Sequence, residues 1–135
     1  MIDFGCGSGV LAIAAAALGA ARVDAFDIDP QAITATRENA RRNDVESLVI
    51  THPPGAAPEA QMHQSADVLV ANILAGPLVE LAPTFSELVR QDGLIALAGL
   101  LEDQVQMVAG AYSGTFRIST GAAMETWCRL DGVRL

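Results

Sequence analysis

The stretch Met1-Ile-Asp-Phe-Gly-Cys-Gly-Ser-Gly9, at the start of the chain, decides the fold. Its apolar segment predicts a short strand over Ile2–Phe4, and three glycines follow at alternate positions. Residues of high helix propensity come next and predict a helix over Ser8–Leu18. A strand, a glycine turn and a helix open a nucleotide-binding α/β unit, in which backbone and free N–H groups at the helix start approach the ligand closely.

A second acidic position lies one crossover downstream of the glycines. The stretch Arg22–Phe26 predicts the next strand, and Asp27 follows it directly. A carboxylate at this place suits the two hydroxyls of a ribose. The sequence therefore predicts a cofactor that contains adenosine.

Two classes of cofactor fit the glycine pattern. Gly7-Ser-Gly9-Val-Leu-Ala12 also satisfies the relaxed fingerprint of dinucleotide enzymes, so an NAD-dependent enzyme is one alternative. Asp3 favours S-adenosylmethionine, because its carboxylate would repel a pyrophosphate but attract a sulfonium and an ammonium. The predicted cofactor-binding residues at this end of the chain are Asp3, Gly5, Gly7, Gly9 and Asp27.

The composition agrees with one domain over residues 1–135. The chain is 51% hydrophobic but only 4% aromatic, which is typical of a parallel sheet covered by helices. The formal net charge is −8, and Arg41-Arg42 is a lone basic pair, so we expect no direct contact with nucleic acid. The apolar run Val10–Ala21 is too short to cross a bilayer, and we expect no membrane contact.

The cysteine pattern bears on compartment and on metals. Cys6 and Cys128 are far apart in the sequence and lack the spacing of metal ligands. We therefore expect two packed thiols, a cytoplasmic location and no metal.

Strands and helices alternate along the rest of the chain, with a long Pro-containing loop over His52–Ser65. This order predicts an α/β fold with a doubly wound, mostly parallel sheet and a C-terminal antiparallel hairpin. The predicted elements are a helix from Asp29-Pro30 to Arg42, a strand within Glu46–Thr51, a strand over Asp67–Asn72, a helix from Gly76-Pro77 to Arg90, a turn at Asp92-Gly93, a strand over Leu94–Ala98, a helix over Leu101–Ala111, and two strands over Phe116–Ser119 and Glu125–Leu130.

The first strand is expected to be central in the sheet, yet only a few residues precede Gly5. We therefore expect a fragment whose first strand is truncated.

Asn72 ends a predicted strand at the carboxyl edge, where ligands bind in open α/β sheets. Its side-chain oxygen can accept a hydrogen bond from an attacking amine and direct the lone pair of that amine at a methyl carbon. We predict that Asn72 is catalytic. The alternative is an asparagine that only makes a turn before the next helix.

Several segments together carry a resemblance that spans nearly the whole chain and is weakest at His52–Ser65 and Val105–Ala123. The segments are Ile2-Asp-Phe-Gly-Cys-Gly-Ser-Gly9, Asp27-Ile-Asp-Pro-Gln-Ala-Ile33, Glu38-Asn-Ala40, Ala71-Asn-Ile-Leu-Ala-Gly-Pro-Leu78 and Trp127-Cys128. With them the chain resembles the PrmA family, class I methyltransferases of large-subunit ribosomal protein eleven.

The resemblance implies transfer of methyl groups from S-adenosylmethionine to lysines and the N-terminal amine of that ribosomal protein. It also implies cofactor contacts for Gly5, Asp27 and Asn72. The resemblance also implies a separate N-terminal substrate-binding domain, which we expect to be absent here, so a non-catalytic cofactor-binding fragment is the other alternative.

The remaining polar and aromatic residues are expected to be structural. His52 and His63 are predicted to be solvated or packed in the loop, and Asp29 to cap a helix. Phe4 and Trp127 are predicted to lie in the core. The sequence does not identify a general base.

Overall fold

The computed structural model describes residues 1–56, 58 and 62–135. Part of the predicted loop over His52–Ser65, namely residues 57 and 59–61, lies outside the described residues. The chain divides into an N-terminal unit, Met1–Ala57, and a C-terminal unit, Pro58–Leu135. In the described ranges, no helix is both long and apolar enough to span a membrane.

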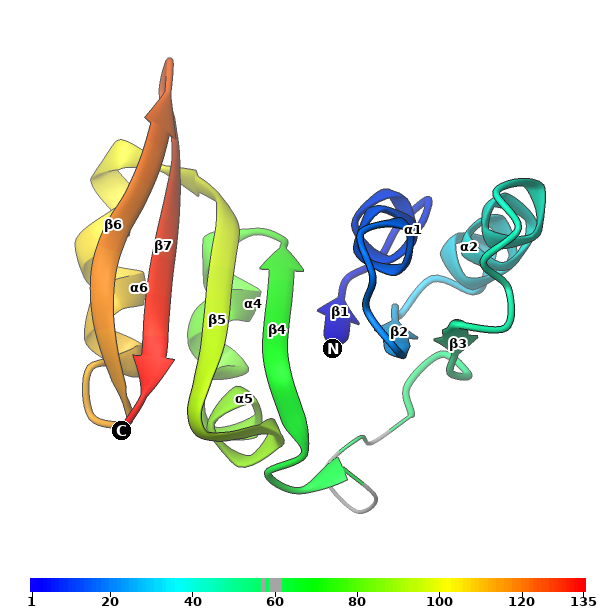
Figure 1. The fold of residues 1–135 in the computed structure, drawn as a ribbon. Helices are drawn as coiled ribbons and strands as arrows, with labels where there is room; N and C mark the ends of the chain where they lie inside the picture. Colours follow the sequence, from blue (N-terminus) through cyan, green and yellow to red (C-terminus); the bar gives the residue numbers. More distant parts are fainter. Residues whose placement is uncertain (57, 59–61) are drawn as a thin grey trace. The chain divides into compact units, whose positions relative to one another are not determined.

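The N-terminal unit contains three parallel strands in the order β3-β2-β1 (Figure 1). The elements of this unit are β1 (Ile2–Phe4), α1 (Val10–Ala17), β2 (Val23–Phe26), α2 (Pro30–Arg42) and β3 (Val49–Thr51). Residues of both helices pack in one cluster with Val23 and Ala25, which share a face of β2. The two helices therefore cover the same face of these strands.

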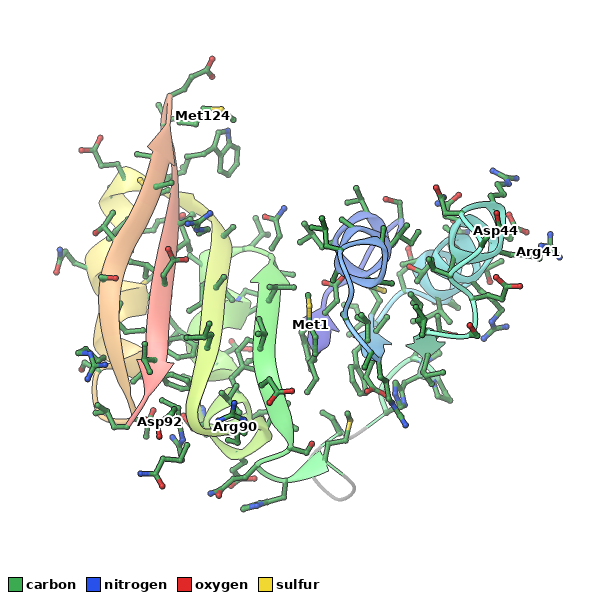
Figure 2. All side chains as sticks on the ribbon, viewed as in Figure 1. Met1, Arg41, Asp44, Arg90, Asp92 and Met124 are labelled. Carbon is green, nitrogen blue, oxygen red and sulfur yellow. The ribbon has the colours of Figure 1, made fainter. Side chains whose placement is uncertain are left out.

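Small side chains allow α1 to lie close to the strands. Ala12 and Ala16, one helical turn apart, are buried in the cluster, so the alanine-rich sequence forms the inner face of the helix. The second helix begins as predicted, because Asp29 accepts a hydrogen bond from the N–H of Gln31 and Pro30 occupies the first turn. Figure 2 shows the far end of α2, with Arg41 and Asp44 on the surface.

The C-terminal unit contains four strands in the order β4-β5-β7-β6. The pair β4-β5 is parallel, and β7 is antiparallel to both of its neighbours. The elements of this unit are β4 (Ala66–Asn72), α4 (Ala75–Glu80), α5 (Ala82–Leu88), β5 (Val89–Leu101), a short 3-10 helix (Glu102–Gln104), α6 (Val105–Tyr112), β6 (Phe116–Met124) and β7 (Trp127–Arg134).

One face of these four strands is covered by α4, α5 and α6 (Figure 1). Alternate residues of β5, Ile95 and Leu97, are buried, whereas Leu94, which precedes them and points to the other face, is exposed. The hydroxyl of Tyr112 on α6 donates a 2.7 Å hydrogen bond to the carbonyl of Leu78 on α4, which joins the two helices inside the core.

The predicted C-terminal antiparallel hairpin is confirmed, and its two strands are β6 and β7.

The prediction of one helix from Gly76-Pro77 to Arg90 is wrong. The structure has two helices that meet at Leu81, with Pro83 in the first turn of the second. Proline has no N–H and its ring crowds the preceding turn, so it suits the start of a new helix better than the middle of one. Val89 and Arg90 belong to β5, where Val89 pairs with Ala66.

The predicted boundaries around β5 are also corrected. The strand runs to Leu101, which pairs with Trp127, so the predicted helix over Leu101–Ala111 begins only at Val105. The predicted turn at Asp92-Gly93 is an irregularity inside β5, where Asp92 has a φ of 61°. Figure 2 shows Arg90 and Asp92 at this start of the strand.

The hairpin strands are longer and shifted relative to the prediction. Glu125, predicted to be in a strand, lies in the turn with a φ of 55°, and β6 continues to Met124. The stretch Gly121-Ala-Ala123 has weak strand propensity, but pairing with β7 keeps Ala122 and Ala123 extended beyond a bulge.

Candidate functional site

The glycine turn between β1 and α1 has a backbone conformation that residues with a side chain rarely adopt. Gly5, Gly7 and Gly9 have φ values of 81°, 55° and 84°, which L-residues rarely adopt. A Cβ on Gly9 would lie 2.9 Å from the side chain of Thr36 on α2. A Cβ on Gly7 would have no atom within 4 Å, so the space beside Gly7 is open.

Asp3 caps the helix that follows the turn. Its Oδ2 accepts a 2.9 Å hydrogen bond from the N–H of Ala12, in the first turn of α1. Gly9, at the N-cap position, has no side chain to do this, so the carboxylate of the preceding strand takes over the role. The prediction treated Asp3 only as a ligand-binding residue and missed this structural role.

The other oxygen of Asp3 is an orphan. Asp3 is only 1% exposed, and its Oδ1 has no hydrogen-bond partner among the residues that the structure describes. Burial raises the pKa of Asp3 to about 6; the hydrogen bond from Ala12 opposes this effect, and the nearby charge of Asp27 adds to it. A positive group beside Oδ1 would favour the ionised carboxylate.

Asp27 clamps the glycine turn to the end of β2. Its Oδ2 accepts a 2.9 Å hydrogen bond from the N–H of Gly7, and its Oδ1 accepts one of 2.9 Å from the N–H of Asp29. The N–H groups of Gly5 and Cys6 both donate to the carbonyl of Phe26. The predicted residues Asp3, Gly5, Gly7, Gly9 and Asp27 are therefore brought together in the N-terminal unit.

Asn72 lies in the C-terminal unit, at the carboxyl end of β4 as predicted. It pairs with Ala98 of β5, and its side chain is exposed. It lines a cavity of about 590 Å3 within this unit. The other lining residues come from the segment after β4, the end of β5 and the tip of the hairpin, and they are Ile73, Leu74, Ala98, Gly99, Ala122, Ala123, Met124, Trp127, Cys128 and Arg129.

The prediction that Trp127 is a core residue is wrong. Trp127 is 51% exposed, and Met124, which it pairs with across the hairpin, is 76% exposed. Figure 1 shows the tip of β6–β7 reaching past the ends of β4 and β5, and Figure 2 labels Met124 at that tip. The side chain of Trp127 is thus a wall of the cavity, a role that its apolar character alone did not reveal.

His52 is packed, as one of the two predicted possibilities. Its Nε2 lies 2.8 Å from Oδ1 of Asp24, and its ring stacks on that of Phe26 at 4.2 Å. Burial acts to raise the pKa of Asp24, but hydrogen bonds from Arg22 and His52 outweigh it, so the pKa is lowered. These contacts explain His52 as a structural residue. His63 is exposed.

Comparisons with known proteins agree with this arrangement. All residues 1–135 match the model of the family described as ribosomal protein L11 methyltransferase (PrmA). The chain is 53% identical over 133 residues to the ribosomal protein L11 methyltransferase of Edwardsiella ictaluri and 52% identical over 132 residues to that of Escherichia coli. It covers 44% of each of these proteins, so it spans less than half the length of the curated relatives that it matches.

Solved structures show the same fold. The ribosomal protein L11 methylase of Lactobacillus delbrueckii subsp. bulgaricus matches 98% of this chain with 68% of its own, at a TM-score of 0.88 and 33% identity. An RNA methyltransferase of Salinibacter ruber, solved with S-adenosyl-L-homocysteine, covers 98% of this chain and 78% of its own at a TM-score of 0.72 and 19% identity. These matches confirm the predicted doubly wound, mostly parallel α/β fold. The chain belongs to the ribosomal protein L11 methyltransferase family.

Proposed function

We propose that this chain is the S-adenosylmethionine-dependent methyltransferase part of its protein, and that the amines it methylates are lysines and the N-terminus of ribosomal protein L11. The family match over the whole chain carries this proposal. The free, buried thiols Cys6 and Cys128 support a cytoplasmic location, where thiols stay reduced.

The residues around the glycine turn suit this cofactor. The orphan Oδ1 of Asp3 and the carboxylate of Asp27 make the turn favourable for a cation, and the open space beside Gly7 lets a ligand approach the backbone. The same carboxylates would repel the pyrophosphate of a dinucleotide. We propose that Asp27 accepts hydrogen bonds from the ribose hydroxyls, since each of its oxygens has a second lone pair.

When bound, S-adenosylmethionine supplies a methyl group on a positively charged sulfur, which is already a good leaving group. The task of the chain is then mainly to orient an amine. We propose that Asn72 Oδ1 accepts a hydrogen bond from the amine and directs its lone pair. The exposed faces of Trp127 and Met124 offer apolar contact for the aliphatic stem of a lysine.

The amine must lose a proton before transfer, because an ammonium has no free lone pair. The described lining of the cavity contains no carboxylate and no histidine. We propose that the proton leaves to solvent, so that Asn72 receives an amine that is already neutral.

Calorimetric titration tests the cofactor assignment. The chain is titrated with S-adenosylhomocysteine and, separately, with NAD. Binding of S-adenosylhomocysteine alone is expected, and binding of NAD alone would contradict the proposal.

Methyl transfer is then measured by mass spectrometry of ribosomal protein L11 after incubation with S-adenosylmethionine. Asn72→Ala should lower the transfer rate at saturating S-adenosylmethionine by about a hundredfold, as misorientation of a reacting group does. Asn43→Ala, at an exposed asparagine after α2, is the matched control and should leave the transfer rate unchanged. Cofactor binding with no transfer would instead identify a non-catalytic fragment.

A further inference from the structure

The end of β5 contains a bulge next to Asn72. Leu97 pairs with Leu130 and Leu100 pairs with Cys128, so Ala98 and Gly99 together face a single residue of β7. Gly99 has a φ of 84° at this bulge. On its other side, β5 pairs with the end of β4, where Ala98 lies opposite Asn72. The bulge in β5 therefore lies beside Asn72, the last residue of β4.

The backbone after Asn72 lies against the α-carbon of Gly99. A Cβ at this position would lie 2.5 Å from the carbonyl oxygen of Ile73, 3.0 Å from its carbonyl carbon and 3.1 Å from Oδ1 of Asn72. The N–H of Ile73 in turn donates a 3.2 Å hydrogen bond to the carbonyl of Ala98. The absence of a side chain thus lets the Asn72–Ile73 backbone reach this hydrogen bond.

From these contacts we infer that Gly99 is a positioning residue for Asn72. Because Gly99 has no side chain, the backbone at Asn72 and Ile73 can pack against it, and this packing fixes the position of the Asn72 amide oxygen. This inference rests on the proposed function for the role of Asn72. Any L-side chain at 99 would push on a backbone carbonyl, which cannot rotate away as the end of a flexible side chain can. To reach 3.4 Å, the lower limit of ordinary contact, the Ile73 oxygen would have to move about 0.9 Å.

Crystal structures of the chain and of its G99A variant test the position directly. We expect the Ile73 carbonyl and the Asn72 side chain to be displaced in G99A. Gly93→Ala is the matched control, because a Cβ at Gly93 would also be crowded, at 2.8 Å from the carbonyl oxygen of Arg90, but at the opposite end of β5. Unchanged positions of Ile73 and Asn72 in G99A would overturn the inference.

G99N is the second variant if G99A does not fold. Asparagine tolerates a positive φ better than alanine, so it relieves part of the backbone strain while it keeps the Cβ contact. The same displacement is expected in G99N.

Transfer rates then show whether the position matters for the reaction. They are compared for the wild-type chain, G99A, N72A and the double variant. G99A should lower transfer roughly tenfold or more in the wild-type background, but cause no further loss in N72A. An equal loss in both backgrounds would mean that Gly99 is only structural and would overturn the inference. If N72A transfers as fast as wild type, the proposed role of Asn72 fails, and the crystal structures still decide whether Gly99 positions it.

Discussion

Two carboxylates organise the glycine turn, and each does so through backbone N–H groups. Asp3 caps α1 through Ala12, and Asp27 binds the N–H groups of Gly7 and Asp29. At the scale of single residues, then, the side chains proposed to bind the cofactor also hold the turn in the shape that receives it. A substitution at Asp3 or Asp27 can therefore change both the shape of the turn and its affinity for the cofactor.

Asp27→Ala should weaken binding of S-adenosylhomocysteine at least tenfold. The proposed charge-assisted hydrogen bonds to the ribose are worth roughly 1.5–3 kcal/mol, and about 1.4 kcal/mol is one decade of affinity. Calorimetric titration measures the change. Asp29→Ala is the control, since it removes only the cap of α2. An unchanged affinity in a folded Asp27→Ala chain would show that Asp27 does not hold the ribose.

Asp3 should make the folded state less favourable as the pH rises. Its pKa is about 6 in the folded chain and 3.8 in the reference state, so the folded state holds the proton more tightly. The contribution of Asp3 to stability is therefore complete below about pH 3.8 and is lost as the pH rises through about 6. Asp3→Asn does not titrate and keeps an acceptor for the N–H of Ala12.

Urea unfolding from about pH 4 to about pH 8 measures this effect. Relative to wild type, Asp3→Asn should gain about 3 kcal/mol in free energy of unfolding across that range. It should also bind S-adenosylhomocysteine less tightly, because the charge that attracts the ammonium is gone. Asp103→Asn, at an exposed carboxylate, is the control. A difference between Asp3→Asn and wild type that does not vary with pH would contradict the assignment.

At the scale of elements, the glycine turn has one side that faces open space and one side that packs on α2. Beside Gly7 a Cβ meets nothing, whereas beside Gly9 it meets Thr36. The two glycines share a positive φ, so a substitution costs backbone strain at both positions. Only at Gly9 does it also disturb helix packing.

Gly7→Val should therefore abolish binding of S-adenosylhomocysteine while it lowers the melting temperature less than Gly9→Val does. The valine at position 7 occupies the space proposed for the ligand, and the valine at position 9 pushes α2 away from the turn. Thermal unfolding and calorimetry, carried out on both variants, separate the two effects. Retained binding in Gly7→Val would place the ligand elsewhere.

Local signals and pairing decide different parts of these elements. Asp29-Pro30 marks the start of α2 correctly, because a cap and its N–H partner are neighbours in the chain. The predicted ends of β5 and of the hairpin strands are wrong, because where these strands end depends on their pairing with β7. The helix after β4 could have been divided from the sequence, since Pro83 is itself the signal.

At the scale of the whole molecule, acidic residues outnumber basic ones by 16 to 8. A negative surface attracts cationic substrates over a distance that salt shortens, from a Debye length of about 10 Å at 0.1 M to about 3 Å at 1 M. The net charge of the chain is thus compatible with the proposal that it methylates lysines.

The KM for a lysine-rich peptide should accordingly rise several-fold between about 0.05 M and about 0.5 M salt, with little change in kcat. A peptide that carries one target amine among acidic residues is the matched comparison, and its KM should stay level or fall. Steady-state methylation of both peptides provides the measurement. The same rise in KM for both would show that salt acts on something other than charge attraction.

The sequence by itself determined the fold class, the glycine turn, the place of Asp27 and the position of Asn72 at the end of a strand. These follow from residues close together in the chain, where spacing and backbone preference act directly. Only the tertiary structure decided that Asp3 caps α1, that Trp127 is a wall of a cavity and that Gly99 lies against the backbone after Asn72. Each of these depends on contacts between different strands and helices, and the spacing of residues within a single element does not fix such contacts.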